Sequence, residues 1–296
     1  MSYTHILGSV RGPVDHFRVS WTSHPAVVPC EIELELACEQ HDALRRAIEA
    51  AGGSTRTVGF IPGCHDSPFV KDGAVLMSQH GERRALIALP RHSERAMEAD
   101  RRAQQFSDCD HVERTRFQFE GGDVVRTSHG RYLLGHGYRS MRNATHQLAS
   151  FVGAEVFPIA LKDERLVHLD MAVAHLPGGE LLVARNAISR SDLLRLHELP
   201  EVTCVAQVPM MDALDYALNV ICIGQTIITS SRSARVRELL ERRGYEVVFV
   251  ALDEFHKSGG GAASLVAPVH GAELAIRSSS ESGVRPAIQE PLSVAV

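Results

Sequence analysis

Four short segments place acidic, imidazole or glycine residues directly beside apolar, strand-like sequence. They run from His65 to Asp72 (HDSPFVKD), from Phe119 to Asp123 (FEGGD), from His168 to Asp170 (HLD) and from Lys257 to Ser264 (KSGGGAAS). Carboxylates hold a flat cation by paired hydrogen bonds, His transfers protons near neutral pH, and glycines let a ligand approach the backbone closely. Each segment on its own also fits a plain turn. The set of four is therefore what indicates chemistry.

The order and local form of these segments resemble the guanidino-group-modifying superfamily, which contains dimethylarginine dimethylaminohydrolases, arginine deiminases and amidinotransferases. The matching motifs are F-x-x-D in the region 66–72, E-G-G-D at 120–123, H-x-D at 168–170 and G-G-G-x-x-C at 259–264, where Ser264 stands in place of the cysteine. The resemblance spans about residues 1–270. A single motif of this kind is weak evidence for the superfamily, whereas the four motifs in this order are specific evidence for it.

The resemblance implies a chemical role for each of these side chains. Carboxylates fix a guanidinium and keep it cationic. In the family a thiolate attacks the guanidinium carbon, an amine leaves with a proton from His, and water activated by the same His releases the product. The implied roles are catalysis by His168, Ser264 and Glu120, and substrate binding by Asp66, Asp72, Asp170, Arg139 and Asn219. Glu120 is expected to orient His168, and the carboxylates of residues 72, 120 and 170 are expected to converge in one pocket.

Two of the implied binding residues also have plain interpretations. Arg139 would hold the α-carboxylate of the substrate, and an ordinary exposed arginine explains it equally well. Asn219 would orient a loop at the site, or only satisfy a strand edge. A second arginine that the family uses would lie near Pro90, where this chain has Leu89, with Arg91 and Arg95 close by.

Ser264 is the main departure from the family pattern. A Ser hydroxyl beside one His is a far weaker nucleophile than a thiolate, because its pKa is much too high for ionisation near neutral pH. Three explanations stay open: a Cys→Ser replacement that inactivates the chain, a weakly active or non-catalytic natural relative, and a different chemistry.

Lys71 is a second departure, because the dimethylarginine hydrolases have Glu at this position. We therefore predict a hydrolase acting on the guanidino group of arginine or a methylated arginine, giving citrulline plus an amine or ammonia. The alternatives are an amidinotransferase that passes the amidino group to an amine, and a non-catalytic guanidine-binding protein.

Short apolar strands and amphipathic helices alternate along the chain. Apolar periodicity predicts helices at 31–51, 93–105, 140–152, 189–196 and 231–243. Strands are predicted at 4–8, 54–60, 73–77, 84–89, 118–126, 132–135, 155–160, 171–175, 180–184, 203–207, 217–223, 225–229, 246–251 and 264–269.

A unit of hairpin, helix and strand thus recurs about five times, which is typical of an α/β fold. The resemblance implies that five such modules form one α/β propeller around a central site, with the first and last strands close together. We expect this single domain at 1–276 and a poorly ordered polar tail at 277–296.

The composition is that of an ordinary globular protein, with 44% hydrophobic residues and 31 basic against 36 acidic side chains, a net charge of −5. Without a basic block, neither nucleic acid nor an anionic membrane surface is expected as a partner. The N-terminal residues lack a secretory pattern and no stretch reaches about 18 apolar residues, so we expect a cytosolic protein.

The sequence predicts neither a metal nor another cofactor. The six cysteines form no CxxC pair, and the 16 histidines include no HExxH spacing. The expected partner is a small guanidino substrate. The sequence does not decide whether the chain forms a homodimer.

Overall fold

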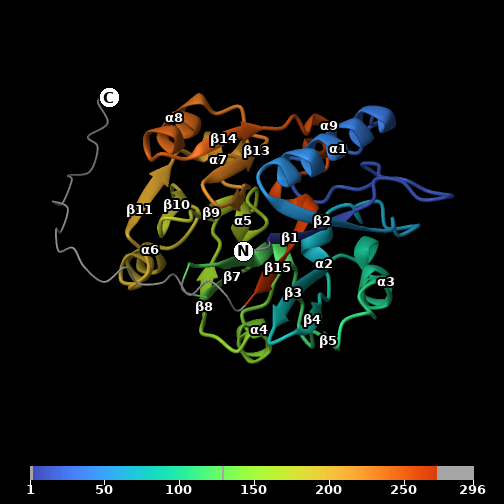
Figure 1. Cartoon of the computed structure of the whole chain (residues 1–296), viewed down its shortest axis with the longest axis horizontal. Helices are drawn as coiled ribbons and strands as arrows, with labels where there is room; N and C mark the ends of the chain where they lie inside the picture. The colour runs from blue at the N-terminus through green and yellow to red at the C-terminus, as the bar shows by residue number, and fades with distance from the viewer. Residues whose placement is uncertain (1–2, 129, 272–296) are drawn as a thin grey trace.

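In the part of the chain that the structure describes, the strands form one six-stranded sheet and three three-stranded sheets. The computed structural model describes residues 3–128 and 130–271 (Figure 1), so the tail predicted at 277–296 lies outside the described residues. The strands are β1 Tyr3–Gly8, β2 Gly53–Val58, β3 Ala74–Gln79, β4 Glu82–Ile87, β5 His111–Arg114, β6 Val124–Arg126, β7 Tyr132–His136, β8 Val156–Ala160, β9 Val173–His175, β10 Glu180–Ala184, β11 Cys204–Val208, β12 Ile221–Ile223, β13 Thr226–Thr229, β14 Glu246–Phe249 and β15 Val266–Gly271.

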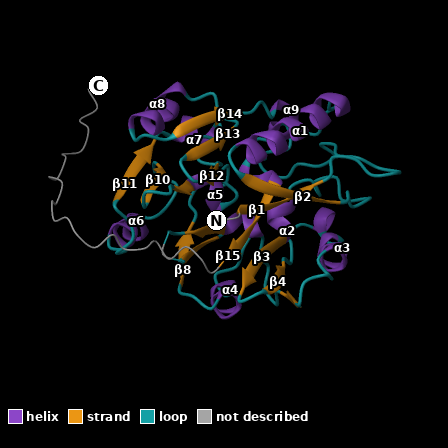
Figure 2. Cartoon of the chain, viewed as in Figure 1, coloured by secondary structure: helices purple, strands orange, loops and turns teal. Residues whose placement is uncertain are grey.

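Helices of two kinds connect these strands (Figure 2). The longer ones are α1 Leu34–Ala50, α3 Glu98–Gln105, α4 Ala144–Val152, α6 Arg190–His197 and α8 Ala234–Arg242. The short helical turns are α2 Val70–Gly73, η1 Ser93–Arg95, η2 Gly121–Asp123, α5 Leu169–Ala172, α7 Met210–Leu214, α9 Asp253–His256 and η3 Ala263–Leu265. The five longer helices confirm the five helices predicted from periodicity, with boundaries that differ by a few residues.

One arrangement of three strands occurs five times within the described residues. Two strands pair antiparallel, and the second of them pairs in parallel with a third strand that follows a longer helix. The units are β15-β1-β2, β3-β4-β5, β6-β7-β8, β9-β10-β11 and β12-β13-β14. The recurring unit predicted from the sequence is thus present in a mixed α/β fold.

The first unit joins the two ends of the described chain. β1 pairs antiparallel with β15, so that His5 lies opposite Pro268. β15 also pairs in parallel with β3, which merges two units into the six-stranded sheet. The expectation that the first and last strands lie close together is therefore confirmed.

Several strand predictions differ from the structure, and two of the predicted strands, 171–175 and 264–269, begin in the helical turns α5 and η3. The sequence predicted a strand over 118–126, but residues 121–123 form the turn η2 and the strand β6 begins only after it. The reason is that two consecutive glycines and the buried Asp123 do not pair with a neighbouring strand. Strand β5 was not predicted, since its sequence HVER has one apolar residue and all four of its residues are exposed.

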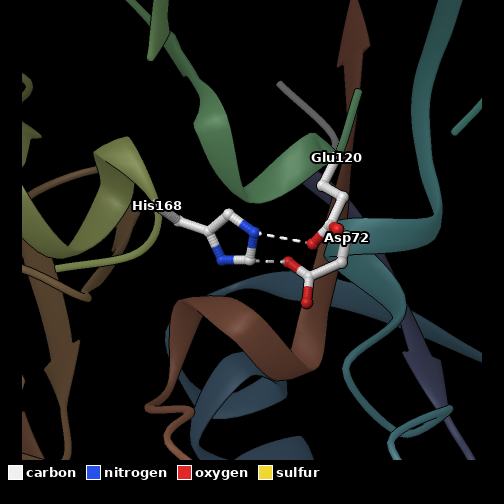
Figure 3. Close-up of side chains that lie close together, drawn as sticks. All are labelled: Asp72, Glu120 and His168. Carbon is white, nitrogen blue, oxygen red and sulfur yellow. Dashed lines mark hydrogen bonds and ion pairs between the residues drawn. The ribbon is translucent and has the colours of Figure 1, made fainter. Parts of the chain in front are cut away.

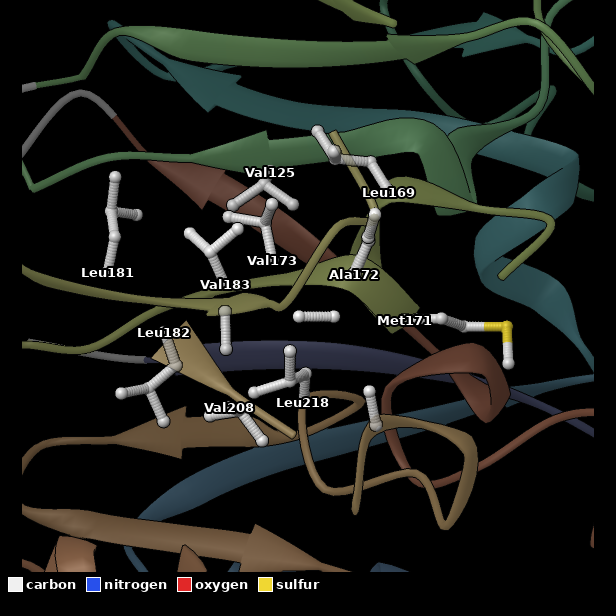
Figure 4. Close-up of a cluster of buried hydrophobic side chains, with 14 of the residues drawn as sticks. Val125, Leu169, Met171, Ala172, Val173, Leu181, Leu182, Val183, Val208 and Leu218 are labelled. Atoms are coloured by element: carbon white, nitrogen blue, oxygen red, sulfur yellow. The ribbon is translucent and has the colours of Figure 1, made fainter. Parts of the chain in front are cut away.

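The largest apolar cluster surrounds β9 and β10 (Figure 4). Leu181, Leu182, Val183 and Ala184 are each at most 1% exposed. Such a continuous apolar run, without polar alternation, fits a strand that is covered on both faces. Over the residues that the structure describes, no helix has the length and apolar character needed to cross a bilayer.

Candidate active site

Except for Arg139, which lies between β7 and α4, the predicted site residues lie on the segments that lead into the first strand of each unit. Asp72 lies in α2 before β3, Glu120 directly precedes η2 and β6, and His168 is the N-cap of α5 before β9. Asn219 lies between α7 and β12, and Ser264 lies in η3 before β15. Turn α2 contacts η2 and η3, and α5 contacts η2 and α7. The repeated topology therefore gathers residues that are far apart in the sequence.

A small buried cavity of about 30 Å³ lies where these turns meet. Of the predicted residues, Asp66, Asp72, Arg139, His168 and Ser264 line it. The loop between β1 and α1 also contributes to the lining, through Trp21, Ser23 and His24. This volume has room for a water molecule or two, and an arginine side chain needs more.

His168 is held between two carboxylates (Figure 3). Its Nε2 lies 2.9 Å from Glu120 Oε2, and its Nδ1 lies 3.6 Å from Asp72 Oδ1. Burial alone would lower the pKa of this imidazole, but the charge of Asp72 and the hydrogen bond with Glu120 outweigh it and raise the pKa to about 9. His168 is therefore an imidazolium at neutral pH, which is the form that can donate a proton.

We expect the His168 ring to titrate with a midpoint near pH 9 in NMR spectra of protein with labelled histidine side chains, against 6.5 for an unperturbed imidazole. Because the folded pKa is the higher one, this group stabilises the fold fully below pH 6.5, and its contribution is lost as the pH rises through 9. Glu120→Gln should lower the midpoint by removing one of the charges. A midpoint at or below 6.5 in the unsubstituted chain would contradict this assignment of charge.

Glu120 is fully buried and bonded on both sides. Arg139 Nη1 donates to Glu120 Oε2 at 2.9 Å, and Arg139 Nη2 donates to the backbone carbonyl of Ser23 at 2.7 Å. Burial would raise the pKa of Glu120, but Arg139 and His168 hold it well below its usual range. Arg139 is only 5% exposed, so its interpretation as a surface residue is wrong.

Arg95 forms a buried ion pair with Asp72. Its Nη1 donates to Asp72 Oδ2 at 2.6 Å, and its Nε and Nη2 donate to the two carboxylate oxygens of Glu98. In the sequence analysis, Arg95 was noted only because it lies close to Leu89, where the family has a second arginine. The R-x-x-E spacing of Arg95 and Glu98 was the available signal, and the pairing with Asp72 could not be read from it.

Two other predicted carboxylates have different partners. Asp66 lines the cavity and accepts hydrogen bonds from Trp21 Nε1 at 2.6 Å and from Ser258 Oγ at 2.7 Å. Asp170 does not line the cavity, because Lys71 Nζ lies 2.5 Å from its Oδ2 in a buried ion pair. The structure thus brings Asp72 and Glu120 together around His168 and keeps Asp170 apart.

Ser264 is positioned by Asn219. The side-chain Oδ1 of Asn219 accepts a hydrogen bond from the Ser264 backbone N–H at 3.2 Å and from Ser264 Oγ at 3.4 Å. Asn219 is fully buried, which fits an orienting role better than a strand edge. Ser264 and His168 line the same cavity.

The two glycines after Glu120 are required by close contacts. A Cβ on Gly121 would overlap the backbone carbonyl of Lys71. A Cβ on Gly122 would lie 2.6 Å from Asp72 Oδ1 and 2.7 Å from His168 Cγ. The glycines therefore let η2 pack directly against Asp72 and His168, which explains the EGGD motif in physical terms.

Asp72, Glu120 and His168 also have the spacing of a metal-binding group, with one ligand atom from each within 4.8 Å of the others. The guanidinium groups of Arg95 and Arg139 already bind the two carboxylates. A divalent cation would therefore meet two positive charges, and we assign no metal to this group. That the chemistry needs no metal stays a prediction.

Comparison with known proteins gives consistent relatives, although no protein-family model matches the chain. The bifunctional arginine dihydrolase/ornithine cyclodeaminase ArgZ of Synechocystis is 33% identical over 151 residues, which is 50% of this chain and 21% of ArgZ. The match thus spans about a fifth of the length of that protein. The dimethylarginine dimethylaminohydrolase of Mycobacterium tuberculosis is 26% identical over 262 residues, covering 87% of this chain and 84% of that enzyme.

A solved structure agrees over a longer stretch. The N-terminal domain of ArgZ bound to product superposes with a TM-score of 0.81 at 25% identity, over 92% of this chain and 99% of that domain. The names of these relatives describe hydrolases of arginine and dimethylarginine. The resemblance to the guanidino-group-modifying superfamily, predicted from four motifs, is confirmed.

Proposed function

We propose that this chain, a homologue of enzymes that act on the guanidino group, is a hydrolase of the guanidino group of arginine or a methylated arginine, giving citrulline and an amine or ammonia. The observation that carries the proposal is the His168 imidazolium, fixed by Asp72 and Glu120 in a cavity that it shares with residue 264. The names of the relatives support the substrate class. As part of the same proposal, the five units form an α/β propeller whose turns surround this cavity.

Substrate binding starts from Oδ1 of Asp72. Oδ2 is bonded to Arg95, whereas Oδ1 is buried, lies 3.6 Å from His168 Nδ1 and has no hydrogen-bond partner. A substrate guanidinium would donate to Oδ1, and its positive charge would be favoured by the carboxylates of Asp66 and Asp72 in the lining. Because a cavity of about 30 Å³ is smaller than an arginine side chain, its lining has to widen when a substrate binds.

The reaction then needs a nucleophile and an acid. The deprotonated side chain at 264 would attack the guanidinium carbon, the C–N bond to the amine would break, and His168 would give its proton to the leaving amine. Water would next attack the covalent amidino adduct, return a proton to His168 and free the side chain of residue 264. The net change is hydrolysis of one C–N bond, and the protons balance over the cycle.

Ser264 makes this cycle slow in the chain as it stands. A hydroxyl must lose its proton to attack, and His168, which would be the base for this step, is already protonated at neutral pH. The same observation favours a second candidate function, a non-catalytic protein that binds guanidines in this pocket.

Binding of L-arginine to the unsubstituted chain tests what both candidates share. We expect saturable binding by isothermal titration calorimetry, and at least roughly tenfold weaker binding of L-lysine, because a point-like ammonium cannot match the planar guanidinium at a carboxylate. Equal affinity for the two amino acids, or no binding of either, would remove the proposal.

A further inference from the structure

Two buried side-chain atoms in the lining of the active-site cavity have no hydrogen-bond partner. One is Asp72 Oδ1, an anionic acceptor, and the other is His24 Nε2. Buried polar groups are nearly always paired in folded proteins. An unpaired acceptor and an unpaired ring nitrogen in one cavity therefore indicate a ligand with complementary groups.

The hydrogen-bond pattern shows which hydrogen His24 carries. Its Nδ1 accepts from the backbone N–H of Ala26 at 3.2 Å, so the ring hydrogen lies on Nε2. Burial, with smaller effects from Arg139 and His168, lowers the pKa of His24 to about 4. At neutral pH His24 is thus an uncharged ring that offers one N–H donor and has no acceptor for it.

Both sides of His24 are fixed by neighbouring elements. On one side, the carbonyl of the preceding Ser23 accepts the hydrogen bond from Arg139. On the other side, a Cβ on Gly259 would overlap His24 Nε2, so only glycine leaves room for the ring. The donor is therefore held between a cationic residue and the glycine-rich turn, where an anionic oxygen is the favoured acceptor.

We propose that His24 is a specificity-determining residue, which donates from Nε2 to a carboxylate oxygen of the substrate while Asp72 Oδ1 accepts from its guanidinium. This inference rests on the proposed function, since it assumes that a guanidine occupies the cavity. It selects amino acids that carry both a carboxylate and a guanidinium over guanidines that lack the carboxylate. The four sequence motifs did not indicate a role for His24, because this residue lies outside all of them.

The test compares two ligands on four proteins by isothermal titration calorimetry. The ligands are L-arginine and agmatine, which has the same guanidinium and no carboxylate. The proteins are the unsubstituted chain, His24→Phe, His24→Gln and the control His16→Phe, which changes the same loop outside the cavity lining. His24→Phe removes the donor and keeps a ring, whereas the side-chain amide of His24→Gln keeps an N–H donor.

We expect His24→Phe to weaken L-arginine binding about tenfold and to leave agmatine unchanged. His24→Gln should recover most of the arginine affinity, and His16→Phe should bind both ligands like the unsubstituted chain. An unchanged arginine affinity in His24→Phe overturns the inference, as does an equal loss for both ligands, which would indicate a purely structural role. If the unsubstituted chain binds neither ligand, the proposed function fails and the inference fails with it.

Discussion

Ser264→Cys should raise the rate of citrulline release from L-arginine or a methylated arginine by roughly a hundredfold or more over the unsubstituted chain. A thiol with an ordinary pKa of about 8.5 is partly ionised near neutral pH, whereas a hydroxyl is not. The imidazolium of His168 and the bound guanidinium would both favour the thiolate. The same positive charge gives no help to Ser264, whose hydroxyl would still need a base.

The measurement is a paired assay of citrulline and of amine or ammonia, with arginine, its methylated forms and an acceptor amine supplied in turn. Ser264→Ala is the matched control, because it removes the side-chain oxygen and should show no more turnover than the unsubstituted chain. Substantial turnover by the Ser264 chain itself would mean that residue 264 is not the nucleophile. A folded Ser264→Cys protein that binds arginine and releases nothing would favour the guanidine-binding alternative. Transfer to the amine would favour an amidinotransferase.

The order of motifs predicted much of the site because each motif sits at the same place in a repeated unit. Turns that lead into the first strands need glycines and short polar residues, and these give recognisable letters such as those at 120–123 and 168–170. The strands and longer helices were predictable for a related reason, since their apolar periodicity reflects the core that they bury. Pairing of β1 with β15 followed from the predicted fold.

The sequence could not predict which charged side chains pair with one another. Asp72 and Asp170 have the same side chain, yet one faces the cavity and the other is bound to Lys71. Arg95 and His24 carry no motif, and their roles depend on a 2.6 Å contact and on an unpaired nitrogen that exist only in three dimensions. A pattern of letters specifies residue types, and the partner of each type depends on packing.

Asp72→Asn should weaken the binding of L-arginine more than any other single carboxylate replacement in the cavity, by roughly a hundredfold, because it removes the charge that faces the guanidinium. The amide keeps the size of the side chain and one acceptor oxygen. It also removes one of the three carboxylate charges that raise the pKa of His168, so the midpoint of that imidazole should fall below 9 in the same protein.

Asp170→Asn is the control that separates position from charge. It removes the same charge from a neighbouring carboxylate that lies outside the cavity lining and is bonded to Lys71. We expect it to destabilise the fold, since a buried Lys71 loses its partner, while arginine affinity changes far less than in Asp72→Asn. Calorimetric titration of both folded variants with L-arginine decides the matter. An equal loss of affinity would place the guanidinium between the two carboxylates, and a larger loss in Asp170→Asn would mean that Asp72 serves Arg95 and His168 only.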